Sequence, residues 1–304
     1  MLSHAITRYI EQRRVLGFKY RSQGVLLNSF AAFAENRGDR FVRTATVLNW
    51  AARASSPAQR RNRLLTVRRL ACTLHAEDDR HQIPPADALG QASFVRSAPH
   101  IYTAEELRRL LQAAAQLTPR QSIRPTTYVT LFALLAATGL RVSEALALGF
   151  DDITAEGLLI HETKFRKSRL VPLHPTTRDA LTRYRQHREA SGFTDPAVFV
   201  SLHGTRLSYS TVISVFLQLV RAVGIHPGPG RRGPRLHDFR HTFAVRSLER
   251  CANDREAVER HMLALSTYLG HSHVTDTYWY LQATPILLAQ IAAAGEACYR
   301  EVQS

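Results

Sequence analysis

The sequence predicts a mostly helical protein with a small β-hairpin sheet, divided into two domains. Three observations carry this prediction. Most of the 304 residues fall into segments whose apolar residues recur at helical spacing. One stretch, 157–173, instead alternates apolar and polar residues on both sides of a basic turn, which is typical of a β-hairpin. An aperiodic stretch containing several prolines separates two groups of helical segments.

The first domain is expected at residues 1–80 and consists of short helices separated mostly by Gly or Pro. Arginine pairs such as Arg68-Arg69 suit contacts with phosphates, although a solvated basic face has the same pattern. Residues 81–102 are expected to form an interdomain linker. The second domain is then expected at 103–304.

Signals for helix ends define the first elements of the second domain. Thr103 and Glu106 have the spacing of a capping box and precede an amphipathic helix. An apolar helix follows and is expected to end at Gly139, with a short helix starting near Val142. Beyond the hairpin, helical spacing predicts further helices in the segments 176–190, 208–224, 237–250, 254–270 and 285–302.

The composition limits the classes of function. Forty Lys and Arg against twenty-five Asp and Glu give a net charge of +15, which favours nucleic acid as partner over a merely basic surface. The sequence has no apolar run long enough to span a membrane and no secretory signal at its start, so we expect a cytoplasmic protein. The scattered Cys72, Cys251 and Cys298 indicate neither a disulfide framework nor a zinc site.

The few lysines mark the hairpin turn. Only Lys19, Lys164 and Lys167 are lysines among the forty basic residues, and two of these lie within "TKFRKSRL". Lysine can give up its proton, whereas arginine stays protonated at any working pH. The turn is therefore a candidate site of proton transfer, although an exposed basic turn is common.

Two further stretches combine charged and titratable residues at helical spacing. Arg141 follows the helix-ending glycine, and Glu144 lies one turn later, where it could hold the arginine or form an ordinary surface pair. His237, Arg240 and His241 share one helix face, which joins a proton carrier to a phosphate clamp. Histidines four apart can bind zinc, but an intervening arginine repels a dication, so no metal site is expected.

Four motifs, taken in order, resemble the tyrosine recombinase (phage integrase) family of DNA strand-exchange enzymes. They are "ATGLRVSEALAL", "KSRLVPL", "LHDFRHTFA" and "LGHSHVTDTYWY", and they extend over roughly residues 103–290. The resemblance implies a helical core-binding domain followed by an α+β catalytic domain. It also implies metal-independent, cofactor-free cleavage and rejoining of double-stranded DNA through a covalent 3′-phosphotyrosyl link.

The resemblance assigns roles residue by residue. Arg141 and Arg240 would clamp the scissile phosphate, with His271 donating a further hydrogen bond. His237 would act as general base, Lys164 would protonate the departing 5′-oxygen, and Tyr280 would be the nucleophile. The supporting residues would be Glu144 and His241.

Neighbouring residues compete for two of these roles. On a helix, residues two apart point about 200° away from each other, so Tyr278 and Tyr280 cannot both face the site. The family spacing from His271 falls on Tyr280. Lys167 is the rival of Lys164, which aligns with the tip of the hairpin.

The resemblance also implies assembly on DNA, as a dimer on each site and a tetramer in the synapse. It leaves open whether accessory DNA-bending proteins take part, and whether the apolar helix at 285–302 packs on its own domain or into a neighbouring subunit. The rival functions are a type IB topoisomerase, a DNA-binding regulator without catalysis, and a basic RNA-binding protein.

Overall fold

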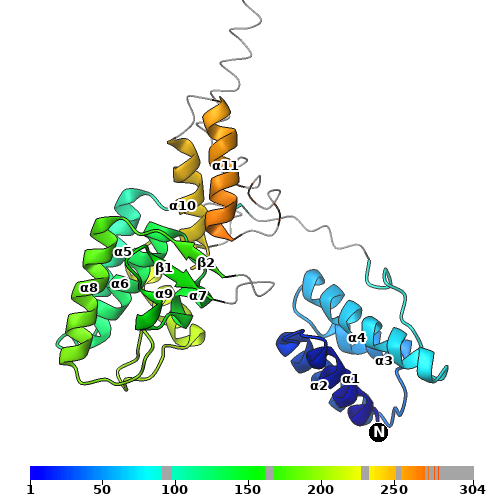
Figure 1. The fold of residues 1–304 in the computed structure, drawn as a ribbon. Coiled ribbons are helices and arrows are strands. Elements are labelled where there is room, and N and C mark those ends of the chain that lie inside the picture. Colours follow the sequence, from blue (N-terminus) through cyan, green and yellow to red (C-terminus); the bar gives the residue numbers. More distant parts are fainter. Residues whose placement is uncertain are drawn as a thin grey trace, which may run out of the picture. The chain divides into compact units, whose positions relative to one another are not determined.

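The computed structural model describes residues 1–90, 98–161, 168–226, 233–250 and 255–270, together with His273, Thr277 and Tyr280. The chain divides into two compact units, Met1–Arg96 and Ser97–Ser304, each with its own hydrophobic core (Figure 1). The division falls inside the stretch expected as a linker.

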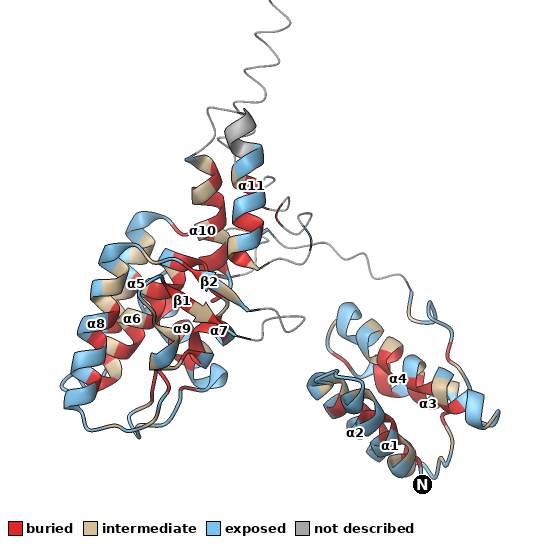
Figure 2. Ribbon diagram, in the orientation of Figure 1, coloured by how far each residue is buried: buried red, intermediate tan, exposed pale blue. Residues whose placement is uncertain are grey.

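The first unit is a helical bundle around one apolar core. Its described helices are α1 (Leu2–Val15), α2 (Arg21–Glu35), α3 (Thr44–Ala52) and α4 (Pro57–Glu77). Each is buried along one side and exposed along the other (Figure 2). The rings of Phe30 and Trp50 meet edge to face in this core, with 5.4 Å between their centroids. α4 begins at a proline preceded by a capping serine, Ser56, which accepts a hydrogen bond from the backbone N–H of Gln59.

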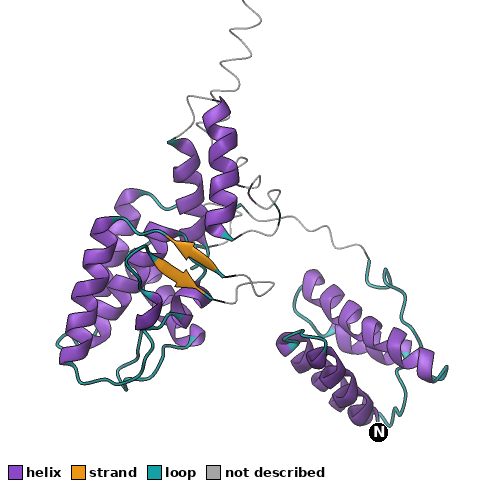
Figure 3. Cartoon of the chain, viewed as in Figure 1, coloured by secondary structure: helices purple, strands orange, loops and turns teal. Residues whose placement is uncertain are grey.

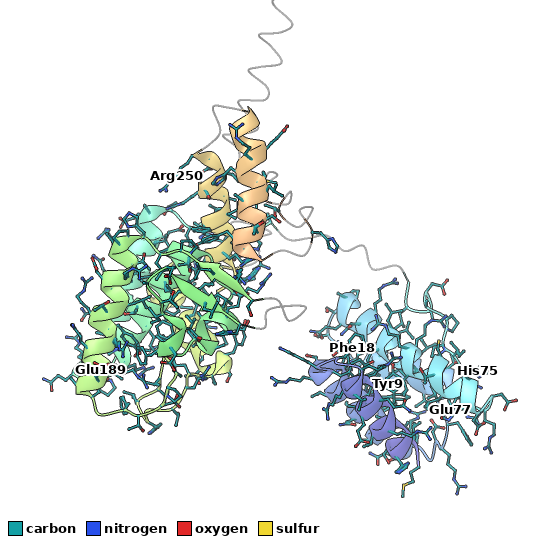
Figure 4. All side chains as sticks on the ribbon, viewed as in Figure 1. Tyr9, Phe18, His75, Glu77, Glu189 and Arg250 are labelled. Atoms are coloured by element: carbon teal, nitrogen blue, oxygen red, sulfur yellow. The ribbon has the colours of Figure 1, made fainter. Side chains whose placement is uncertain are left out.

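The chain after α4 folds back onto the first unit. The backbone N–H of Val42 donates to His81 Nδ1 at 3.1 Å, and the His75 ring contacts the His81 carbonyl oxygen at 2.6 Å. Figure 4 shows His75 and Glu77 at the C-terminal end of α4, where Glu77 forms an ion pair with Arg8 of α1. The start of the expected linker is thus fastened to the first unit.

The second unit combines helices with a small antiparallel sheet (Figure 3). Its described elements are α5 (Ala104–Ala115), α6 (Ile123–Thr138), α7 (Val142–Ala147), a 3-10 turn (Phe150–Asp152), β1 (Leu158–Ile160), β2 (Arg169–Val171), α8 (Pro175–Ala190), α9 (Tyr209–Ala222), α10 (Asp238–Glu249) and α11 (Arg255–Leu269). The predicted fold class, mostly helical with a small β-hairpin sheet, is confirmed.

α6 is the central helix of this unit. It packs against α5, α8 and α10, and all of its residues except Ala137 are buried or half-buried. A helix enclosed in this way has little room for charged side chains, and α6 contains only one, Arg124 in its first turn. It begins at Ile123, after the capping residue Ser122, and ends where predicted, at Gly139.

The other predicted boundaries near the site are also present. The capping box forms, with the backbone N–H of Glu106 donating to Thr103 Oγ1 and that of Thr103 donating to Glu106 Oε2. The two strands pair in antiparallel register, Leu158 with Val171 and Ile160 with Arg169. The turn between them, with Lys164 and Lys167, lies outside the described residues, as does the segment 285–302.

Tyr102 fastens the start of the second unit to α10. It is fully buried, and its ring stacks on Phe239 with 5.0 Å between centroids. Its backbone N–H donates to Thr242 Oγ1 at 2.9 Å, and its carbonyl oxygen accepts from Arg246 at 2.5 Å. The end of the expected linker is therefore held by the helix that carries Arg240.

Across the residues that the structure describes, no helix has the length and apolar character needed to cross a bilayer.

Candidate active site

Arg141 lies at the junction of α6 and α7, where Gly139 turns the chain. Gly139 adopts φ +61°, and a Cβ atom there would lie 2.6 Å from the Phe243 ring, so only glycine fits without displacement. Arg141 precedes the first turn of α7 and has a helix on either side of it. The expected contact with Glu144 is present: Arg141 Nη1 donates to Oε1 at 2.6 Å, and the backbone N–H donates to Oε2 at 3.0 Å.

Glu144 is shared between two arginines, one of which the sequence analysis missed. Arg169 of β2 donates through Nη1 to Oε1 at 3.1 Å and through Nη2 to Oε2 at 2.8 Å. Burial alone would raise the pKa of Glu144, but the hydrogen bonds and charges of Arg169 and Arg141 outweigh it and lower this pKa to about 2. The carboxylate is therefore ionised at neutral pH and fixed from both sides.

Arg240 is buried in α10, with 1% of its surface exposed. Its Nη1 donates to the Gly139 carbonyl oxygen at 2.9 Å, and its Nη2 donates to the Leu269 carbonyl oxygen at 2.6 Å. Burial lowers the pKa of Arg240 to about 10, and the positive charge of Arg141 acts in the same direction. The guanidinium is still protonated at neutral pH, and its orientation is set by two elements distant in sequence.

The C-terminal end of α11 gathers three arginines. Its successive carbonyl groups at 268, 269 and 270 accept hydrogen bonds from Arg169 Nε at 2.9 Å, Arg240 Nη2 at 2.6 Å and Arg141 Nη2 at 3.2 Å. Carbonyl groups at a helix end have no intrahelical donor and carry partial negative charge. The helix end thus offsets part of the repulsion between guanidinium groups that are held close together.

His237 immediately precedes α10 and keeps an exposed surface. The segment is held by Asp238, whose buried carboxylate accepts from the backbone N–H of Arg235 at 2.9 Å and from its Nη2 at 2.8 Å. Surrounding protein atoms, and then the charges of Arg240, Arg235 and Arg141, lower the pKa of His237 to about 4. The imidazole is therefore neutral near pH 7 and able to accept a proton.

Tyr280 is buried, with 3% of its surface exposed, and belongs to the apolar cluster that α10 and α11 form. Its ring lies 5.4 Å from that of His241, which in turn lies 4.8 Å from the ring of His237. A hydrogen bond to the Tyr280 side chain supports the charged form of Arg240. The phenol is thus beside the predicted phosphate clamp.

The structure brings together most of the predicted site residues, in one region formed by α7, α10 and the end of α11. They are Arg141, Glu144, His237, Arg240, His241 and Tyr280. Two predicted members, Lys164 and His271, lie outside the described residues, as do the rivals Lys167 and Tyr278. In the described ranges, no three His, Cys, Asp or Glu side chains gather as metal ligands.

Arg169 carries little signal in the sequence. It is one of many arginines, and its partner Glu144 is 25 residues away, so neither composition nor helical spacing connects them. The hairpin prediction does place it at the start of the returning strand, which is the signal that could have drawn attention to it.

Comparison with known proteins identifies the family. Residues 101–285 match the phage integrase family. The chain belongs to this family. The resemblance predicted from the four motifs is confirmed, and the chain is a tyrosine-type site-specific recombinase.

One relative matches nearly the whole recombinase and another about half of it. A putative integrase/recombinase, y4rB, of Sinorhizobium fredii (strain NBRC 101917 / NGR234) is 42% identical over 297 residues, which is 94% of each chain. The tyrosine recombinase XerD of Lacticaseibacillus casei is 35% identical over 154 residues, covering 49% of this chain and 48% of its own.

Solved structures share the fold. XerH bound to a palindromic difH substrate has a TM-score of 0.65 at 18% identity, covering 90% of this chain and 78% of that chain. A lambda integrase dimer bound to a COC′ core site has a TM-score of 0.64 at 19% identity, covering 92% and 76% respectively.

Proposed function

We propose that the recombinase cuts and rejoins double-stranded DNA at specific sites, without a metal ion, through Tyr280. The Tyr280 oxygen attacks the scissile phosphorus and forms a new P–O bond, while the bond from phosphorus to the 5′-oxygen breaks. The products are a 3′-phosphotyrosyl link and a free 5′-hydroxyl. Because the link keeps the bond energy, a 5′-hydroxyl from a second duplex reverses the step without ATP.

Arg141 and Arg240 stabilise the charge that develops on the non-bridging phosphate oxygens. Two prearranged guanidinium groups offer parallel donors without reorganisation during the reaction. His271 adds a further hydrogen bond. Glu144 holds Arg141, and His241 supports the helix that carries Arg240.

Two residues move the protons. His237 accepts the proton of the Tyr280 hydroxyl, a role that requires the neutral imidazole, which is the form present near pH 7. Lys164 donates a proton to the departing 5′-oxygen, which an arginine does not do because it retains its proton.

One observation carries this proposal. The buried Tyr280 lies beside His241 and forms a hydrogen bond with Arg240, and the two guanidinium groups of the clamp are fixed on the same helix end. A buried phenol in a structural core needs only one hydrogen-bond partner, so packing alone does not require a second guanidinium group fixed on the same helix end. The arrangement suits a nucleophile next to an anion site.

The two domains would have different roles. Residues 1–80 would bind DNA as the core-binding domain, supported by fifteen Arg and Lys against six Asp and Glu in that range. Residues 81–102 would link it to the catalytic domain at 103–304. The recombinase would act in the cytoplasm.

Assembly follows the same scheme, as a dimer on each DNA site and a tetramer in the synapse. Fold neighbours include a lambda integrase dimer on a core site and a lambda integrase tetramer on a Holliday junction. Gel filtration with a two-site DNA, with and without residues 285–302, tests whether that segment joins the subunits. If accessory DNA-bending proteins are needed, the tetramer on the two-site DNA forms only when a cell extract is added.

The decisive experiment traps the covalent intermediate. The protein is incubated with a labelled, nicked duplex carrying the cognate site and then denatured. Label is expected on wild type and on Tyr278→Phe but not on Tyr280→Phe. If only Tyr278→Phe loses the label, the nucleophile is Tyr278 instead of Tyr280. Tight DNA binding without label on any protein contradicts the proposal and favours a regulator, whereas relaxation of supercoils without strand exchange favours a topoisomerase.

A further inference from the structure

Arg169 uses its guanidinium group to join three parts of the site. It starts β2, and 12% of its side chain is exposed. Nη1 and Nη2 bind the two oxygens of Glu144 in α7, while Nε donates to the Tyr268 carbonyl oxygen at the end of α11. A planar, two-point contact of this kind sets the angle as well as the distance between its partners.

Glu144 depends on this contact for half of its support. Each of its carboxylate oxygens accepts one hydrogen bond from Arg141 and one from Arg169. The side chain is 7% exposed, so water replaces few of these bonds if Arg169 is removed. A change at Arg169 therefore reaches Arg141 through the carboxylate that they share.

The chain at Gly270 is also shaped around Arg169. Gly270 has φ +67°, and a Cβ atom there would lie 2.9 Å from Arg169 Nη1 and 3.1 Å from its Cζ. The carbonyl oxygen of the same glycine accepts from Arg141 Nη2 at 3.2 Å. Arg169 thus packs against the backbone that anchors the second terminal nitrogen of Arg141.

We propose that Arg169 is a positioning residue for strand cleavage, which aims Arg141 at the phosphate through Glu144 and the backbone at Gly270. The inference rests on the proposed function and deepens it. It connects β2 to α7 and to the end of α11, the two elements that hold Arg141.

The test measures the rate of covalent adduct formation on the nicked duplex as a function of pH. Arg169→Gln is expected to slow cleavage by about 10²-fold near neutral pH, the scale of a misplaced catalytic group. DNA affinity is expected to stay unchanged. Arg169→Lys keeps the charge but loses the two-point contact, so it is expected to restore part of the rate.

The dependence of the cleavage rate on pH distinguishes a role of Arg169 in positioning Arg141 from a role in stabilising the fold alone. The charged groups that face Glu144 are Arg141 just before α7, Arg169 on β2 and Arg240 on α10. Without Arg169, the effect of burial on the Glu144 pKa is less opposed, so the loss of rate toward acid pH is expected to begin at a higher pH than in wild type. The double variant Arg169→Gln/Glu144→Gln has no carboxyl group to protonate at this position, so the shift of the acid-side loss is expected to be absent. Its rate, relative to wild type, is expected to be higher than the product of the relative rates of the two single variants.

Arg108→Gln is the matched control, because it removes an arginine from an exposed ion pair with Glu105. It is expected to cleave as wild type does. Unchanged rate and pH profile in Arg169→Gln overturn the inference, and so does a slower rate that merely follows a loss of DNA binding or of melting temperature. If Arg169→Gln does not fold, the rate, pH profile, DNA binding and melting temperature of Arg169→Lys test the inference in its place. A wild-type protein that forms no adduct contradicts the proposed function instead.

Discussion

Arg240 and Gly139 are joined by a 2.9 Å hydrogen bond from Nη1 to the carbonyl oxygen, across 101 residues of sequence. The glycine that ends α6 thus also holds the buried arginine of the predicted clamp. Its left-handed backbone serves both purposes, because it stops the helix and turns the carbonyl group toward α10.

Gly139→Ala is therefore expected to destabilise the second unit by about 1–3 kcal/mol, the usual cost of strain and overpacking. The added methyl would meet Phe243 at 2.6 Å. Denaturant unfolding followed by circular dichroism measures the change in the free energy of unfolding.

Gly192→Ala is the matched control. Gly192 has φ +74°, but no atom lies within 4 Å of a Cβ placed there. The loss of unfolding free energy in Gly192→Ala therefore measures the backbone strain without a steric clash. Equal losses in the two variants would contradict a role for the Phe243 contact.

Arg240→Lys is expected to reduce the rate of adduct formation by about 10²–10³-fold, as does loss of a prearranged donor to a developing oxyanion. A lysine keeps the charge but does not reach both the Gly139 and the Leu269 carbonyl oxygens with a rigid fork. Single-turnover cleavage of the nicked duplex measures this effect. The exposed Arg185→Lys is the control, and a nearly unchanged rate in Arg240→Lys would exclude the bidentate role.

The low pKa of Glu144 is expected to make the free energy of unfolding fall at acid pH. Its pKa is about 2 in the folded chain and 4.5 ordinarily, so its contribution is fully present above pH 4.5 and is lost as the pH falls toward 2. The size is about 3 kcal/mol, from 1.36 kcal/mol per pKa unit. Glu144→Gln is expected to flatten the curve of unfolding free energy against pH in this range.

The control for that measurement is Glu105→Gln, which removes a carboxylate from an exposed pair with Arg108. It is expected to leave the curve nearly unchanged. An acid-induced loss in Glu144→Gln as steep as that of wild type would show that the pair with Arg169 does not stabilise the fold.

Thr242→Val is expected to destabilise the second unit by about 1–3 kcal/mol, because the buried N–H of Tyr102 loses its acceptor. Val retains the shape of Thr, so the difference reports the hydrogen bond. Thr182→Val, which changes an exposed threonine on α8, is the control in the same unfolding experiment. Equal stability of the two variants would contradict the contribution of this bond.

Local rules predicted the parts of the structure that depend on nearby residues. Gly139 ended α6 as expected, the capping box at Thr103 formed, and Glu144 met Arg141 at a separation of three residues. The alternation around the basic turn predicted the hairpin. In each case the interacting groups are close in sequence, at most thirteen residues apart across the hairpin, from Leu158 to Val171, so chain geometry restricts them.

Contacts between distant segments were beyond these rules. Nothing in the sequence joins Arg169 to Glu144, or Tyr102 to a threonine 140 residues later. The apolar run also does not show that α6 begins at Ile123, where Ser122 caps it and Pro125 is accommodated in its first turn. The roles of the site residues were reached through the family resemblance, since spacing alone also allowed a surface ion pair at Arg141.

The attachment of Tyr102 has a mechanical consequence. Its ring, its N–H and its carbonyl oxygen all contact α10, while the chain before it leads back to the first unit. A change that moves Tyr102 would therefore also move α10, the helix that carries Arg240.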